Sequence, residues 1–291
     1  MRKKKIMSRR EVVRVVQAHR QTEGGGFVVR RPFPTGGLRH ADPFLLLDEM
    51  GPVDYAPGEA IGAPDHPHRG FETVTYVLDG EMEHEDSAGH NGKLASGDVQ
   101  WMTAGRGIVH SEMPSQAFQD RGGRMHGFQI WVNLPKRDKM MAPRYQEISR
   151  DKIPEGTSAD GLAKVKVVAG EALGVKAVIE TRTPISYLHF TLKAGAKVDQ
   201  AIPSDHAAYV YVFEGDAIVS GKDVREGQLA MMGEGDSLEL AASKDAQLLV
   251  LSGVPLKEPV VQYGPFVMNT ESEIRQAIID YQSGRLGEIA R

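Results

Sequence analysis

The sequence of 291 residues contains no cysteine, no long apolar run and no excess of basic residues. Without thiols, the chain has no disulfide framework and no thiolate ligands for iron–sulfur clusters or structural zinc, and it suits a reducing compartment. No apolar run approaches the roughly 18–20 residues that span a bilayer. The net charge of −4 argues against a general nucleic-acid binder. We therefore expect no membrane anchor, no direct nucleic-acid binding and a cytoplasmic location, with a nuclear location open for a eukaryotic protein.

Basic residues gather at the start of the chain. Residues 1–10 hold six Lys or Arg side chains and no acid. No apolar segment follows them, so the pattern is not typical of a secretory signal. We interpret residues 1–10 as a solvated tail.

Short apolar segments separated by glycine-containing turns fill most of the remaining chain. Their spacing of about 8–12 residues is typical of β-sandwiches and barrels. The sequence predicts one β-domain at residues 11–135 and a second at 162–255. The polar, turn-rich residues 136–161 are predicted to be a linker.

A helix is predicted within the tail at residues 256–291. Thr270 and Glu273 have the spacing of a capping box. Apolar side chains follow at the spacing of one helical face: Ile274, Ala277, Ile278 and Tyr281. We expect that face to pack on the β-domains.

Two segments contain metal-binding residue types, each as a pair two positions apart. His66 and His68 form the first pair, and His110 and Glu112 form the second. In an extended strand, residues two positions apart project from the same face. If the two segments are neighbouring strands, three imidazoles and one carboxylate converge on a single point. The sequence therefore predicts a mononuclear metal site.

The ligand types narrow the choice of metal. Mixed imidazole and carboxylate ligands suit Fe, Mn, Ni, Cu or Zn. Four protein ligands on a six-coordinate metal leave two positions for water, O2 or a substrate oxygen, and we favour Fe(II). A single His-x-His pair can arise by chance, so the site hypothesis depends on the presence of the second pair.

Two further residues are candidates for the surroundings of the metal. Glu72 shares strand parity with His66 and His68, and we expect it to accept a hydrogen bond from a ligand imidazole. His126 shares parity with Phe128 in a later strand. It could line the barrel near the metal or form an interior hydrogen bond, and both interpretations are open.

The two halves of the chain look like an internal repeat. Asp205 and His206 precede an apolar strand as Asp65 and His66 do, but only the first half has the second histidine. One histidine does not hold a metal strongly. We expect the domain at 162–255 to be metal-free.

These segments resemble the paired motifs of cupins, and specifically those of the pirin family, whose members are bicupins. The resemblance runs from near residue 23 to the tail and rests on Glu23–Gly26, Asp42–Glu49, Pro64–Glu72, Thr103–Glu112, Gln129–Pro135 and Gly264–Thr270. It implies an all-β fold of two tandem antiparallel, jelly-roll-like β-barrels with a short C-terminal helix. It also implies that His66, His68, His110 and Glu112 bind iron, whereas Glu72 does not coordinate it.

The resemblance implies two kinds of activity. Some pirins resemble quercetin 2,3-dioxygenases, which cleave a flavonol ring with O2, and Glu112 would then take the proton of the substrate hydroxyl. Other pirins are redox-sensing regulators that bind a transcription factor or a metabolic enzyme. We favour the enzyme, with a small aromatic or flavonol-like substrate. It requires a pocket of roughly 300 Å³ or more beside the metal. A structural bicupin with an adventitious metal is a third interpretation.

Overall fold

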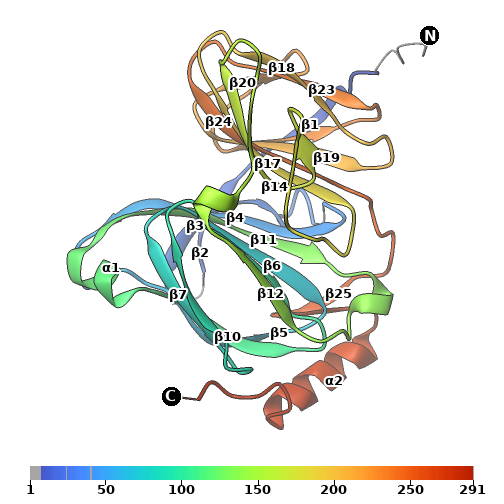
Figure 1. The fold of residues 1–291 in the computed structure, drawn as a ribbon. Coiled ribbons are helices and arrows are strands. Elements are labelled where there is room, and N and C mark those ends of the chain that lie inside the picture. Colours follow the sequence, from blue (N-terminus) through green and yellow to red (C-terminus); the bar gives the residue numbers. More distant parts are fainter. Residues whose placement is uncertain (1–7, 24, 40, 291) are drawn as a thin grey trace. The chain divides into compact units, whose positions relative to one another are not determined.

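The computed structural model describes residues 8–23, 25–39 and 41–290 (Figure 1). Antiparallel strands dominate these ranges. The helices are α1 (Gln116–Arg121), α2 (Glu271–Gln282) and the short 3-10 helices η1 (Lys136–Asp138) and η2 (Arg150–Lys152). In the described ranges, no helix is both long enough and apolar enough to cross a bilayer.

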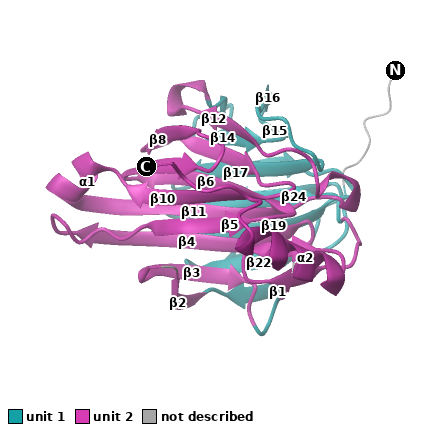
Figure 2. Cartoon of the chain, turned by 90° about the horizontal axis from the view of Figure 1, so that it is seen from below, with its two compact units in different colours: residues 1–18, 36–38, 153–255 teal, residues 19–35, 39–152, 256–291 magenta. Residues whose placement is uncertain are grey.

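The chain divides into two compact units, coloured separately in Figure 2. Unit 1 comprises residues 1–18, 36–38 and 153–255, and unit 2 comprises residues 19–35, 39–152 and 256–291. Both units are built from a seven-stranded and a four-stranded antiparallel sheet. The predicted all-β fold of two antiparallel domains with a short C-terminal helix is confirmed.

Unit 2 contains the strands that carry the predicted metal ligands. Its larger sheet has the order β12-β9-β6-β11-β4-β3-β2 and its smaller sheet the order β5-β10-β7-β8. The strands of the larger sheet are β2 (His19–Glu23), β3 (Phe27–Phe33), β4 (Phe44–Tyr55), β6 (Phe71–Asp79), β9 (Val99–Thr103), β11 (Gly123–Asn133) and β12 (Arg144–Ile148). The smaller sheet comprises β5 (Ala63–His68), β7 (Glu81–Asp86), β8 (Asn91–Ala95) and β10 (Ile108–Pro114), and a separate hairpin pairs β25 (Val261–Tyr263) with β26 (Phe266–Met268).

Unit 1 has the same arrangement of sheets. Its larger sheet has the order β1-β22-β19-β24-β17-β14-β13 and its smaller sheet the order β18-β23-β20-β21. The strands of the larger sheet are β1 (Val12–Gln17), β13 (Glu155–Thr157), β14 (Ala163–Ala169), β17 (Ile185–Leu192), β19 (Ala207–Glu214), β22 (Gln228–Met232) and β24 (Ala246–Gly253). The smaller sheet comprises β18 (Lys197–Ala201), β20 (Ala217–Val219), β21 (Lys222–Val224) and β23 (Ser237–Ala241), and a short hairpin pairs β15 (Glu171–Ala172) with β16 (Val175–Lys176).

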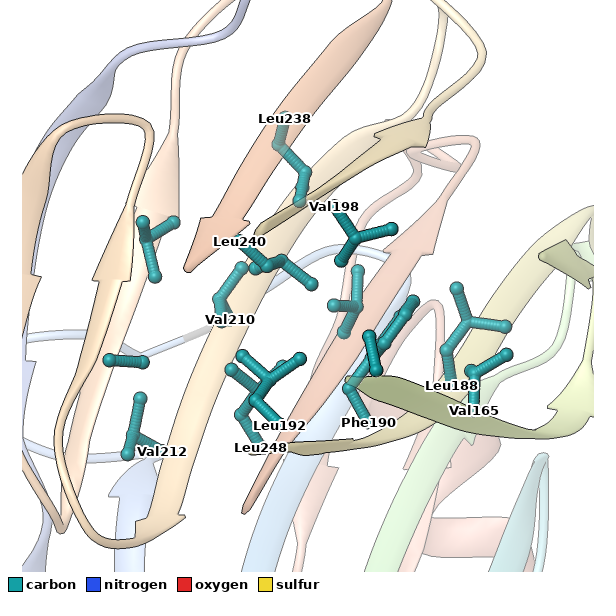
Figure 3. Close-up of a cluster of buried hydrophobic side chains, with 14 of the residues drawn as sticks. Val165, Leu188, Phe190, Leu192, Val198, Val210, Val212, Leu238, Leu240 and Leu248 are labelled. Atoms are coloured by element: carbon teal, nitrogen blue, oxygen red, sulfur yellow. The ribbon is translucent and has the colours of Figure 1, made fainter. Parts of the chain in front are cut away.

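Aliphatic side chains fill the core of unit 1 (Figure 3). Leu188, Phe190 and Leu192 of β17 are fully buried, and they lie two positions apart on one face of the strand. Val210 of β19 and Leu248 of β24 pack in the same cluster. The remaining residues of β17 are also mostly buried, so this central strand is covered on both faces.

The N-terminal strand differs from the prediction. β1 was expected in the domain at 11–135, but it pairs antiparallel with β22, with Val15 opposite Ala230, and belongs to unit 1. The valines predict that this segment is a strand. They do not predict which strand it pairs with, because β22 is far away in the sequence. The predicted linker at 136–161 also contains structure, because β12 pairs with β9.

Most of the tail predicted at residues 1–10 lies outside the described residues. At its described end, Ser8 and Arg9 are exposed, whereas Arg10 is packed into unit 1 rather than solvated. Arg10 is buried and donates hydrogen bonds to the carbonyls of Gly233 (3.1 Å) and Pro203 (2.8 Å). Arg9 forms an ion pair with Glu239 at 2.9 Å.

Helix α2 begins as the sequence predicts. Thr270 accepts a hydrogen bond from the backbone of Glu273, whose side chain bonds back to the cap, so the capping box is complete. Ile274 and Ala277 are buried in a cluster with Val109 of β10. The predicted face therefore packs on the β-structure of unit 2.

Candidate metal centre

The two predicted ligand segments are adjacent antiparallel strands. In the pairing of β5 with β10, His66 lies opposite His110 and His68 lies opposite Ile108. The ring centroids of His66 and His110 are 4.3 Å apart, those of His66 and His68 are 4.7 Å apart, and those of His68 and His110 are 5.0 Å apart. Each ring offers a nitrogen within 4.8 Å of the other two. The three imidazoles thus converge on one point, as their strand positions predict.

Burial keeps two of these rings in the protonation state that binds a metal. His68 and His110 are almost completely buried. Burial first, and the neighbouring imidazoles second, hold the pKa of both groups well below the ordinary histidine value. Both rings are therefore neutral at physiological pH, which is the protonation state that binds a metal.

The unmet hydrogen-bonding capacity of these rings fits a metal. Among the described residues, neither ring nitrogen of His110 has a hydrogen-bond partner, nor does Nδ1 of His68. Buried polar atoms without partners are costly, and a metal bond would satisfy one nitrogen of each ring. Nδ1 of His66 lies 2.7 Å from the Pro64 carbonyl, which orients the ring and leaves Nε2 for a metal. Three imidazoles suit the divalent metals expected from the sequence.

Glu112 lies beside this cluster in a different hydrogen-bonding environment. Its carboxylate accepts hydrogen bonds from Thr75 Oγ1 (2.7 Å) and Gln129 Nε2 (3.1 Å). Within the described residues, the group of mutually close ligand atoms consists of the three imidazoles. The roles of Glu112 as fourth ligand and as base therefore stay predictions.

A pocket of about 620 Å³ opens on His66 and His68, and we call it the metal pocket. It is larger than the roughly 300 Å³ that an aromatic substrate requires. His66, His68 and Glu112 line one part of it. The rest of the wall includes three apolar residues and three charged ones: Phe27, Leu46 and Trp131, and Arg31, Asp48 and Glu23.

The charges in the wall of the metal pocket are largely paired. Arg31 makes a two-pronged contact with Asp48, with N···O distances of 2.6 and 2.5 Å, and an ion pair with Glu23 at 2.9 Å. Burial raises the pKa of Asp48, although the hydrogen bond and charge of Arg31 oppose that shift. Arg31 is consequently held by acids of the protein itself.

Glu72 and His126 occupy positions that only the sheets explain. Glu72 is buried on β6, which belongs to the larger sheet, so the parity argument that linked it to β5 fails. Its carboxylate accepts a hydrogen bond from Thr103 Oγ1 at 2.6 Å, and a role toward the imidazoles stays a prediction. His126 has the interior hydrogen bond that was one of its two interpretations, because Nε2 lies 3.0 Å from Glu49 Oε1.

Sequence reasoning missed Thr75 and Gln129. They lie opposite each other on β6 and β11, and both contact Glu112. A threonine within the buried run of β6 was the available signal, because a buried hydroxyl needs a partner. The identity of that partner depends on the order of the sheet.

Two antiparallel β-units, one with a three-histidine cluster, define a bicupin with a single candidate metal centre in the described chain. The family described as Pirin matches residues 26–132, and the family described as Pirin C-terminal cupin domain matches residues 187–287. The chain belongs to the pirin family.

Relatives of known name cover almost the whole chain. A pirin-like protein of Solanum lycopersicum is 47% identical, over 97% of this chain and 95% of its own length. Pirin of Homo sapiens is 45% identical, over 96% of this chain and 95% of its own length. A crystal structure of a quercetin 2,3-dioxygenase from Acinetobacter baumannii is 38% identical, with a TM-score of 0.92 and coverage of 97% of this chain and 100% of that one.

Proposed function

We propose that the protein is a metal-dependent dioxygenase of the quercetin 2,3-dioxygenase type, which cleaves a flavonol-like ring with O2. The observation that carries the proposal is the convergence of three imidazoles, two of them buried and neutral, beside a pocket of about 620 Å³ that His66 and His68 line. The similarity to the Acinetobacter baumannii enzyme supports the reaction type. Fe(II) is the metal we propose, held by His66, His68, His110 and Glu112 in a reducing cytoplasm.

The residues around the site would have different roles in the reaction. When bound, a divalent metal supplies Lewis-acid polarisation of a substrate oxygen. Glu112 would accept the proton of the substrate hydroxyl, using a lone pair that the two existing hydrogen bonds leave available. Thr75 and Gln129 contact different oxygens of Glu112, so together they fix the plane of the carboxylate.

The wall of the metal pocket supports an aromatic, uncharged substrate. Phe27, Leu46 and Trp131 provide apolar surface against which a planar ring can bury its faces. The side chain of Arg31 is engaged by Asp48 and Glu23, so it is poorly placed to anchor a substrate carboxylate. These contacts favour a neutral phenol over a small organic acid.

The first experiment is elemental analysis of tag-free protein, followed by anaerobic Fe(II) loading and O2 uptake with quercetin. Near-stoichiometric iron and quercetin-dependent O2 consumption are the expected results, with His110→Ala protein carried through the same loading as the control. Bound iron without O2 uptake on several flavonols would contradict the proposed enzyme function. That outcome would favour a regulator that uses the same centre to sense redox state and bind a protein partner, and partner capture would follow.

A further inference from the structure

A second, smaller pocket lies within unit 2, partly open to solvent beside Ile61, and we call it the side chamber. Its volume is about 70 Å³. Apolar side chains from β4, β7, β11 and the segment before β5 form most of its wall: Met50, Val53, Ile61, Met82 and Met125. The chamber is several times larger than the roughly 10–15 Å³ that admits one water molecule, but far below the roughly 300 Å³ of an ordinary organic ligand site.

The side chamber shares a wall with the metal pocket. Phe27, Asp48, Ala63, Glu112 and Gln129 line both cavities. The hydrogen bond from Gln129 to Glu112 therefore lies at the boundary between them. Glu112, which lines the chamber, is two residues from His110. A molecule in the chamber would therefore be next to the candidate metal centre.

The chemistry of the wall disfavours water. An ordered water needs two to four polar partners, and an apolar cavity lacking them stays dry and binds apolar molecules such as xenon. The polar side chains of the wall are few: Asp48, Tyr55, Glu112 and Gln129. Asp48 is already paired with Arg31, and Glu112 accepts hydrogen bonds from Thr75 and Gln129, which leaves it a lone pair at the boundary with the metal pocket. The methionine thioethers are soft and polarizable, which suits contact with a small polarizable gas molecule.

We propose that the side chamber is a binding site for a small apolar gas, and that it supplies O2 to the metal pocket past Glu112 and Gln129. The organic substrate occupies the metal pocket, so the two reactants reach the centre from different cavities. Gas binding follows from the size and lining of the chamber alone. The supply of O2 to a reaction rests on the function proposed above.

Xenon tests the binding site without turnover. Crystals of the protein pressurised with xenon should show an anomalous peak among Val53, Met82 and Met125. Val53→Phe places a ring in the chamber and should remove that peak, and Met125→Phe is a second filling variant should the first fail to fold. Val13→Phe is the matched control, because Val13 is an exposed valine of unit 1. A chamber without xenon in the parent protein would overturn the proposal.

Kinetics with the same variants test the supply of O2. In Val53→Phe, we expect a several-fold rise in the KM for O2 with an unchanged KM for quercetin, and a several-fold slower association of nitric oxide with the Fe(II)-loaded protein. A raised KM for quercetin with an unchanged KM for O2 would instead make the chamber part of the substrate site and overturn the proposal. If quercetin is not turned over at all, the enzyme assignment fails, whereas xenon occupancy and nitric oxide association still decide the gas site.

Discussion

His110 combines almost complete burial with two ring nitrogens that lack hydrogen-bond partners among the described residues. His66 lies opposite it on the neighbouring strand, at a centroid distance of 4.3 Å. Such a ring is costly in a protein interior unless something binds it. A metal ion bound by His110 and His66 would satisfy a ring nitrogen that otherwise lacks a partner. Metal binding is therefore the interpretation that best explains the burial of His110.

Removal of one imidazole should therefore remove the metal. We expect His110→Ala or His66→Ala to reduce bound iron from near-stoichiometric to background and to abolish ring cleavage, because each variant removes one of the four proposed ligands from the ion. Elemental analysis after Fe(II) loading and gel filtration measures the change. His19→Ala, at an exposed histidine of β2, is the control and should retain its iron. Full turnover in a metal-free variant would contradict the assignment of the site.

Glu112 should contribute to turnover through its negative charge. Glu112→Gln keeps the size of the side chain but removes its ability to accept a proton. We expect kcat with quercetin to fall by about 10²–10⁴-fold, the usual range for the loss of a general base. Steady-state O2 uptake on iron-matched samples measures the effect, and Glu85→Gln, at an exposed position of β7, is the matched control. An unchanged kcat at full iron occupancy would exclude Glu112 as the base.

At the scale of elements, a tight turn and an ion pair hold the ligand strand β5 in place. Gly70, between β5 and β6, has a φ of +90°, and a Cβ there would lie 2.0 Å from the Val267 carbonyl. The neighbouring Arg69 is buried, and its guanidinium pairs with Asp280 of α2 at 2.9 Å. The helix is thereby connected to the turn that follows His68.

The ion pair predicts how stability depends on pH. Burial of the carboxyl raises the pKa of Asp280, but hydrogen bonds from Arg285, Arg69 and Gln276 outweigh that effect and lower the pKa to about 2. A pKa lowered on folding stabilises the folded state above the unfolded pKa near 3.8, and this contribution is lost as the pH falls through about 2. Linkage sets about 2 kcal/mol as the upper limit for the shift, and solvent screening of this partly exposed pair reduces the contribution to about 1 kcal/mol.

Asp280→Asn should accordingly lower the free energy of unfolding by about 1 kcal/mol at pH 7. The gap to the parent protein should narrow as the pH falls from 4 towards 2. Urea unfolding followed by tryptophan fluorescence is suitable, because both tryptophans, Trp101 and Trp131, lie in unit 2. Asp223→Asn, at an exposed position of unit 1, should leave this transition unchanged. A gap that is the same at pH 7 and pH 3 would rule out the ion pair as its source.

At the scale of the whole molecule, two similar units differ in their metal chemistry. The described residues hold one cluster of metal-binding side chains, in unit 2. The corresponding histidine of unit 1, His206, lies 3.1 Å from Ser252 Oγ, and burial lowers its pKa. A single ring bonded to a hydroxyl is not a metal site of appreciable affinity.

We therefore predict one tightly bound metal ion per chain. Elemental analysis of the full-length protein after loading and desalting should give a ratio near one, and His206→Ala should leave the ratio unchanged because the second unit contributes no ligand set. Two ions per chain, with the second lost in His206→Ala, would show that unit 1 binds a metal.

The sequence alone determined the features that depend on residues close together in the chain. The two-residue spacing of His66 and His68 places both on one face of a strand, and the capping box of α2 involves residues three positions apart. Short apolar segments between glycine-containing turns likewise predicted the strands that fill both units. These predictions succeed because the direction of a side chain within one element follows from local backbone geometry.

Tertiary structure alone decided which elements become neighbours. It placed β1 beside β22, put Glu72 in a different sheet from β5, and brought Thr75 and Gln129 to Glu112. It also left the side chamber between strands that are far apart in sequence. Strand pairing and cavities depend on contacts between distant residues, whose net free energy is set by the packing of the whole unit. A pattern within one strand carries no information about them.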